Sequence, residues 1–166
     1  TANLTGGTIN ALSTVGNTIG VHAEDTGVIN LSGSNINLLG NNSVGLSLAQ
    51  NSKLKLTNGN ISVGNSGTGI YSKDSTIDMI GYSVTITMGN EGIGLYLDNS
   101  TLNATANQNL NISYNGADKG IGIYYNNNSS PVTNNVVINH NGSNLVNILS
   151  DGIALTNVAN QVVKDG

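Results

Sequence analysis

Apolar and polar residues alternate in short bursts along this chain, and the periodicity of amphipathic helices is almost absent. Each burst carries two or three of Ile, Leu, Val or Met and is bounded by Gly, Asn, Asp or Ser. Alternation of this kind predicts short β-strands separated by tight turns. The bursts come in groups of three, so the pattern predicts a unit of three short strands and three corners.

The sequence EGIGLYLDNSTL, residues 91–102, shows that these groups repeat. Close copies are SVGLSLAQNSKL at residues 43–54 and GTGIYSKDSTI at 67–77, and a looser copy is KGIGIYYNNNSS at 119–130. Each copy has a glycine at its centre, and a further glycine upstream extends the series. These repeat glycines are Gly20, Gly45, Gly69, Gly94 and Gly122. Their steps of 24 to 28 residues are typical of solenoid proteins.

Strands of one type in successive units must lie side by side, at the spacing of about 4.8 Å between neighbouring strands. The sequence therefore predicts an all-β fold, a parallel β-helix (β-solenoid). We expect residues 1–166 to form a single segment of about six coils, with about 25 residues and three short strands in each. In the first strand of each coil we expect the alternating apolar residues to face the core, as with Ile93, Leu95 and Leu97. Beyond residue 142 the repeat blurs, and residues 152–155 fit either a sixth first strand or a second strand.

Asparagine recurs at the third corner of each coil, usually beside a glycine. Asn and Gly adopt left-handed backbone conformations at low cost, and stacked Asn side chains can hydrogen-bond from coil to coil. We therefore interpret this column as structural. The corner Asn column comprises Asn41, Asn65, Asn90, Asn115 and Asn141. Pairs such as Asp74-Ser75 and Asn99-Ser100 are expected to form the turn at the first corner.

The charge of the chain is small: five Lys, no Arg and nine acidic residues give a net charge of −4. A nucleic-acid surface needs clustered Lys and Arg to displace counterions, so we expect no nucleic-acid partner. The chain has no Cys, which excludes disulfides, and no apolar run approaches the roughly 18 residues of a membrane helix. We expect no cofactor and no metal, because His22 and His140 belong to different strands several coils apart.

Parallel β-helices include enzymes that act on polysaccharides, so the carboxylates need consideration. Glycosidases hold two carboxylates about 5 to 9 Å apart across the bond that they break. Asp74 and Asp98 are expected to occupy one column in successive coils, and Lys73 would supply a cation to a cleft beside them. Each acid also stands where a turn favours Asp or Asn. We predict that the chain is not an enzyme and has no catalytic residue; a carbohydrate-active β-helix enzyme or a phage tail-spike segment is the alternative.

One outward column is unusual. Two residues after each repeat glycine come His22, Ser47, Tyr71, Tyr96 and Tyr124. Three tyrosines on consecutive coils predict an aromatic strip about 10 Å long. Exposed aromatic residues are typical of contact surfaces, here for a glycan or a protein. The alternative is that the stacked rings only stabilise neighbouring strands.

The degenerate repeats GIGLYLDNSTLN and GTGIYSKDSTIDM, in a chain with 30 Asn, resemble the passenger domains of bacterial type V autotransporters. The Asn-rich surface adhesins of fusobacteria are the most similar group. The resemblance spans about residues 18–142 and rests on the spacing of the repeats and on composition. It implies a right-handed parallel β-helix, and it supplies no shared site residues.

This resemblance also implies a function. The chain would be an internal slice of a longer passenger domain, carried to the extracellular side of the outer membrane by a C-terminal β-barrel translocator. It would not itself be inserted in the membrane. We therefore expect a non-enzymatic structural and adhesive segment that projects from the cell surface and mediates adhesion to host cells or other bacteria. Its partner would be a surface glycan or protein, with the strip of Tyr71, Tyr96 and Tyr124 as the proposed contact.

Overall fold

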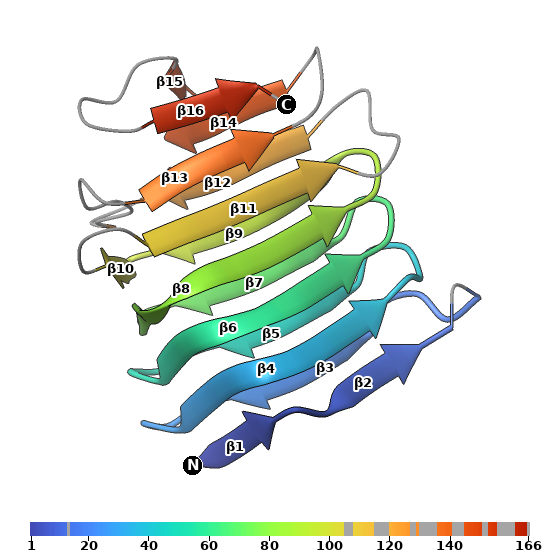
Figure 1. Ribbon diagram of the computed structural model, residues 1–166, viewed down its shortest axis with the longest axis vertical. Coiled ribbons are helices and arrows are strands. Elements are labelled where there is room, and N and C mark those ends of the chain that lie inside the picture. The colour runs from blue at the N-terminus through green and yellow to red at the C-terminus, as the bar shows by residue number, and fades with distance from the viewer. Residues whose placement is uncertain are drawn as a thin grey trace.

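The computed structural model shows a β-solenoid built of two sheets whose strands stack along one axis (Figure 1). It describes residues 1–12, 14–104, 108–114, 120–126, 129, 136–140, 145–150, 153–155 and 162–165. All regular structure in these residues is β-strand, so the all-β class predicted from the alternation is confirmed.

The chain passes in turn between the two sheets. Sheet A contains nine strands: β1 (Ala2–Thr5), β2 (Thr8–Ala11), β4 (Val28–Leu38), β6 (Lys53–Val63), β8 (Thr76–Met88), β10 (Thr101–Ala104), β11 (Gln108–Tyr114), β13 (Val136–His140) and β16 (Val162–Asp165). Sheet B contains seven: β3 (Ile19–Ala23), β5 (Val44–Leu48), β7 (Thr68–Lys73), β9 (Gly92–Asp98), β12 (Gly120–Asn126), β14 (Leu145–Ser150) and β15 (Ile153–Leu155). Every strand pair is parallel except β14–β15 among the described residues.

Figure 1 also shows the hand of the coil. Strands of sheet A run from left to right in front, those of sheet B return from right to left behind, and the chain rises as it turns. This course is right-handed, as for nearly all parallel crossovers. The structure has about four turns, from β3–β4 to β9–β11, where the sequence suggested about six coils. Strands β12, β13, β14 and β16 extend the two sheets beyond these turns.

The prediction of three short strands per coil is right in part. In β4, β6 and β8 the expected second and third strands form one long strand of 11 to 13 residues. Around Gly33 the register of β4 shifts and the backbone has φ +68°, but the strand continues through this irregularity. A bulge of this kind bends a strand without ending its hydrogen-bond ladder. Separate strands do occur in β1–β2 and in β10–β11.

The core between the sheets consists of columns of aliphatic residues. Leu31, Leu56 and Met79 are register partners in successive strands of sheet A and are almost fully buried. Each such side chain contributes roughly 1.5 to 3 kcal/mol by leaving water. Because these columns repeat at every coil, the core needs no large aromatic residue.

The repeat glycines interrupt the alternation of sheet B. A Cβ at Gly94 would lie 2.5 Å from the carbonyl oxygen of Gly122 and 3.1 Å from Ile112 in the core. The position of Gly94 therefore faces inward, as does Leu95, which is fully buried. Because Gly94 and Leu95 both face inward, the side chain of Ile93 faces outward, and it is only half-buried. The prediction that Ile93 faces the core with Leu95 and Leu97 is thus wrong for Ile93.

The end of the solenoid departs from the repeat. Strand β15 runs antiparallel to β14 and pairs Ile153 with Ser150. Residues 153–155 are therefore neither a sixth first strand nor a second strand of a parallel coil.

Candidate functional site

The outer face of sheet B carries two columns of outward side chains. The first lies just before the repeat glycines and is mainly aliphatic: Ile19, Val44, Thr68, Ile93 and Ile121. The second lies two residues after the glycines: His22, Ser47, Tyr71, Tyr96 and Tyr124. We call these the aliphatic column and the tyrosine column. The tyrosine column was predicted from the sequence. The aliphatic column was not, because alternation alone does not show that the repeat glycines face the core.

The three tyrosines are stacked one above the other along the solenoid axis. The ring centroids of Tyr71 and Tyr96 are 5.2 Å apart with an interplanar angle of 27°, and those of Tyr96 and Tyr124 are 4.8 Å apart at 25°. All three side chains are half-buried. The predicted strip therefore exists, but its rings cover one another's faces and present mainly their edges to solvent. The stacking also fits the alternative of mutual stabilisation, which contributes about 0.5 to 1.5 kcal/mol per aromatic pair.

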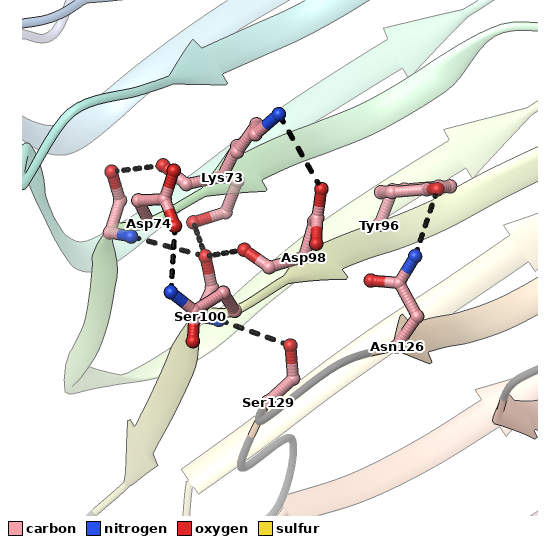
Figure 2. A network of polar contacts seen from close by, with 10 residues as sticks. Lys73, Asp74, Tyr96, Asp98, Ser100, Asn126 and Ser129 are labelled. Atoms are coloured by element: carbon pink, nitrogen blue, oxygen red, sulfur yellow. Dashed lines mark hydrogen bonds and ion pairs between the residues drawn. The ribbon is translucent and has the colours of Figure 1, made fainter.

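Polar residues flank the tyrosine column on the side of the first corner. Asp98 lies beside Lys73, with 3.9 Å between Nζ and the nearer carboxylate oxygen. In Figure 2 the Asn126 amide donates to the Tyr96 hydroxyl at 3.4 Å. Turned over, the same amide donates to Asp98 Oδ1 and to the Leu97 carbonyl, both at 3.1 Å. We adopt the second orientation because it satisfies two acceptors. In both, Asn126 lies between the Tyr96 hydroxyl and Asp98.

The environment of Tyr96 favours its neutral form. Burial raises the pKa of the Tyr96 phenol above its ordinary value of 10.0, and the neighbouring Tyr124, Asp98 and Tyr71 raise it further. The phenol thus remains a hydrogen-bond donor at physiological pH.

A chain of serines joins the coils behind this site. Ser100 lies at its centre, as Figure 2 shows: its hydroxyl donates to the Asp98 carbonyl at 2.9 Å and accepts from Ser72 at 3.1 Å and from the Ser75 amide at 3.2 Å. The amide of Ser100 in turn donates to the Ser129 hydroxyl at 3.0 Å. Sequence reasoning assigned Ser75 and Ser100 only to turns. Their near-complete burial, with the hydrogen bonds above, shows that they also tie successive coils together.

The predicted carboxylate pair is not in register. Asp98 is the partner of Lys73 in the sheet, whereas the Asp74 carboxylate accepts from Asn99 Nδ2 at 2.7 Å. Asp74 lines an open polar hollow with Gln50 and Asn99, and Asp98 does not line it. The prediction of a shared column is wrong because Asp74 follows its repeat glycine by five residues and Asp98 by only four. The counterpart of Asp74 in the next coil is Asn99, and both are left-handed, with φ 49° and 47°.

The corner Asn column forms its ladder differently from the prediction. Asn41, Asn65 and Asn90 are not left-handed; the residue after each of them is, as in Ser66 with φ 52° and Glu91 with φ 58°. This conformation directs the Ser66 amide to the carbonyl oxygen of Asn90 at 2.7 Å. The Asn65 side chain also reaches the next coil, because the backbone N–H of Asn90 donates to Asn65 Oδ1 at 2.9 Å. Asn115 and Asn141 lie outside the described residues.

The outer face of sheet A has a different character, because its outward columns consist mainly of Asn, Ser and Thr, with Lys and Asp near the start of the long strands. Asn60 Nδ2 donates to Asn35 Oδ1 at 2.8 Å, and Asn37 repeats this bond with Asn10 at 2.9 Å. The face also holds one close ion pair, with 2.6 Å between Lys53 Nζ and Asp78 Oδ2. These ladders satisfy the polar groups of one coil with those of the next.

No family model, curated protein or solved structure matches the chain. Within the residues described there is no group of three or more His, Asp or Glu that could hold a metal ion. Those residues also contain no helix long and apolar enough to cross a membrane. The fold and the site define a parallel β-solenoid with a half-exposed tyrosine column, and the resemblance to autotransporter passenger domains stays a prediction.

Proposed function

We propose that this chain is a non-enzymatic structural and adhesive segment of a bacterial surface protein of the autotransporter type. The solenoid acts as a rigid rod, and the outer face of sheet B contacts a glycan or protein on a host cell or another bacterium. The tyrosine column is the centre of that contact.

The observation that carries this proposal is the stacking of Tyr71, Tyr96 and Tyr124 on an outward face. The stack places three large, amphipathic side chains in a fixed geometry, which limits the conformational entropy that binding would cost. Tyrosine is enriched at recognition surfaces because it combines apolar area with a hydroxyl group. The ladders of sheet A supply the rigidity, because each coil is bonded to the next.

Adhesion assays on a panel of host-cell and bacterial surfaces test the proposal. We expect the chain to bind at least one surface, and a triple variant with Tyr71→Ser, Tyr96→Ser and Tyr124→Ser to lose that binding while its β-rich circular dichroism is unchanged. The matched control is Asn35→Ser, Asn60→Ser and Thr85→Ser, one outward column on the same number of coils of sheet A. Binding that survives the tyrosine changes would refute the role of the column; failure of the wild type to bind any surface would make the segment a spacer.

A further inference from the structure

We infer that the outer face of sheet B binds an uncharged, linear β-linked glycan that lies along the solenoid axis, with one sugar unit per coil. This inference rests on the proposed function and specifies the ligand of the same face. It is carried by the spacing, the mixed chemistry and the charge of the two columns.

The spacing of the tyrosines sets the shape of the ligand. The ring centroids advance by 5.2 and 4.8 Å from coil to coil, in line with the register of β7, β9 and β12. An extended β-linked chain of hexoses advances by a similar distance per sugar. Such a chain can present one sugar to each tyrosine in turn, with successive sugars flipped so that different hydroxyl groups face neighbouring rings. An α-linked glycan that coils loses this match after one or two units.

The orientation of the rings determines the kind of contact. Tyr96 has a neighbouring ring on each face, so a ligand meets its edge and its hydroxyl group. That hydroxyl lies near Asn126, on the side of Asp98, and the ring therefore leans away from Ile93 on the same strand. The aliphatic column consequently stays uncovered beside the tyrosines, with Thr68, Ile93 and Ile121 half-buried.

These two columns together match the surface of a sugar ring. The C–H face of a hexose can rest on the aliphatic column, while its hydroxyl groups bond to the phenols and to the amide and carboxylate of the flanking residues. A purely apolar protein segment would leave the row of phenol hydroxyls without partners, which costs free energy. The mixture of apolar and hydroxyl groups therefore favours a carbohydrate over an apolar peptide.

The charge of the face favours neutral glycans over charged ones. Lys73 and Asp98, which flank the tyrosine column, oppose each other at 3.9 Å, and their charges sum to zero. A polyuronate would find no surplus of positive charge here, whereas a neutral hexose or N-acetylhexosamine chain needs none. We therefore expect binding that changes little with salt, because few counterions are displaced.

Isothermal titration with cello- and chito-oligosaccharides of two to six sugars tests the inference. We expect the affinity of at least one series to rise by about tenfold or more between the dimer and the tetramer, as more coils are engaged. Maltohexaose, of the same size but α-linked, should bind weakly or not at all. Equal binding of maltohexaose, or affinity independent of length, would overturn the inference.

Single substitutions localise the site without removing the stack. Tyr96→Phe keeps the ring and removes one hydroxyl, so we expect about three- to tenfold weaker binding of the longest active oligosaccharide. Ile93→Asn should weaken binding through the aliphatic column. Thr85→Ser, on the outer face of sheet A, is the matched control and should leave affinity unchanged. Unchanged affinity in both sheet B variants would place the glycan elsewhere.

The same measurements separate this inference from the proposed function. If the chain adheres to cells through the tyrosines but binds none of the oligosaccharides, the glycan assignment is wrong and the adhesive role stands. If no surface and no oligosaccharide is bound, both fail.

Discussion

The two outer faces of the solenoid are built from the same coils, but their side chains make different contacts. On sheet A the amide of Asn60 bonds to Asn35, and Asp78 bonds to Lys53 and Asn103. On sheet B the tyrosines stack, and the aliphatic column beside them has no such ladder. The polar side chains named on sheet A bond to one another between coils, whereas sheet B presents ring edges, hydroxyls and apolar side chains at its surface.

This difference shows how one residue position that recurs in every coil of a solenoid forms a continuous surface. A residue type chosen at one position is repeated about every 4.8 Å along the axis, so its chemistry becomes a stripe. Stripes of Asn and Ser stabilise the rod, because each adds a bond between neighbouring coils. A stripe of Tyr next to a stripe of Ile adds a continuous recognition surface without changing the fold.

The largest expected effect comes from the glycines that keep the two outward columns of sheet B apart. In Gly69→Ala the new Cβ would lie 2.7 Å from the Gly94 carbonyl oxygen and would clash with the core side chain of Ile86. We expect the free energy of unfolding to fall by about 3 kcal/mol or more, because backbone and core must both move. Urea denaturation followed by circular dichroism measures this.

Gly7→Ala is the control for that substitution. No heavy atom lies within 4 Å of a Cβ at Gly7, so its stability should stay within about 0.5 kcal/mol of wild type. Equal costs at the two glycines would mean that the close approach of coils at Gly69 does not constrain the fold. The separation of the two outward columns of sheet B would then not depend on the repeat glycines.

The repeat, the strands and the tyrosine column follow from the sequence because period and alternation are local patterns. The inward turn at Gly94 does not, since alternation alone assigns Ile93 to the core, and only the contact of Gly94 with the next coil reveals the irregularity. The offset between Asp74 and Asp98 can instead be counted in the sequence, since they follow their repeat glycines by five and by four residues. Backbone conformation at individual turn residues is the part that sequence patterns leave open.

A second prediction compares the energetic weight of the two faces. Tyr96→Ala removes two stacked pairs, and we expect a loss of about 2 to 3 kcal/mol. Asn60→Ala removes one exposed ladder bond and should cost only about 0.5 to 1 kcal/mol. Both are measured by urea denaturation, with Tyr96→Phe as the variant that keeps the stack. If Asn60→Ala costs as much as Tyr96→Ala, the ladders of sheet A are cooperative and contribute more than their single bonds.

The smallest expected effect concerns the ion pair of sheet A and its response to acid. Burial raises the pKa of Asp78, but hydrogen bonds from Lys53 and Asn103 and the charges of Lys53 and Lys55 outweigh it, so the pKa lies below its ordinary value of 3.8. A lowered pKa in the folded state means that the carboxylate stabilises the fold above pH 3.8, and that this contribution is lost as the pH falls through the folded pKa. Acid should therefore weaken the contacts that join β6, β8 and β10 on the outer face of sheet A.

Asp78→Asn tests this through urea denaturation between pH 7 and pH 2. We expect the variant to be less stable than wild type by about 0.5 to 1 kcal/mol at pH 7, because the pair is partly exposed and screened by solvent. The difference should shrink to nothing at low pH, where the wild-type carboxyl is protonated as well. A double-mutant cycle with Lys53→Met isolates the coupling of the pair. A difference that persists at pH 2 would assign the loss to the hydrogen bond with Asn103, and the acid response of sheet A would then need another carboxylate.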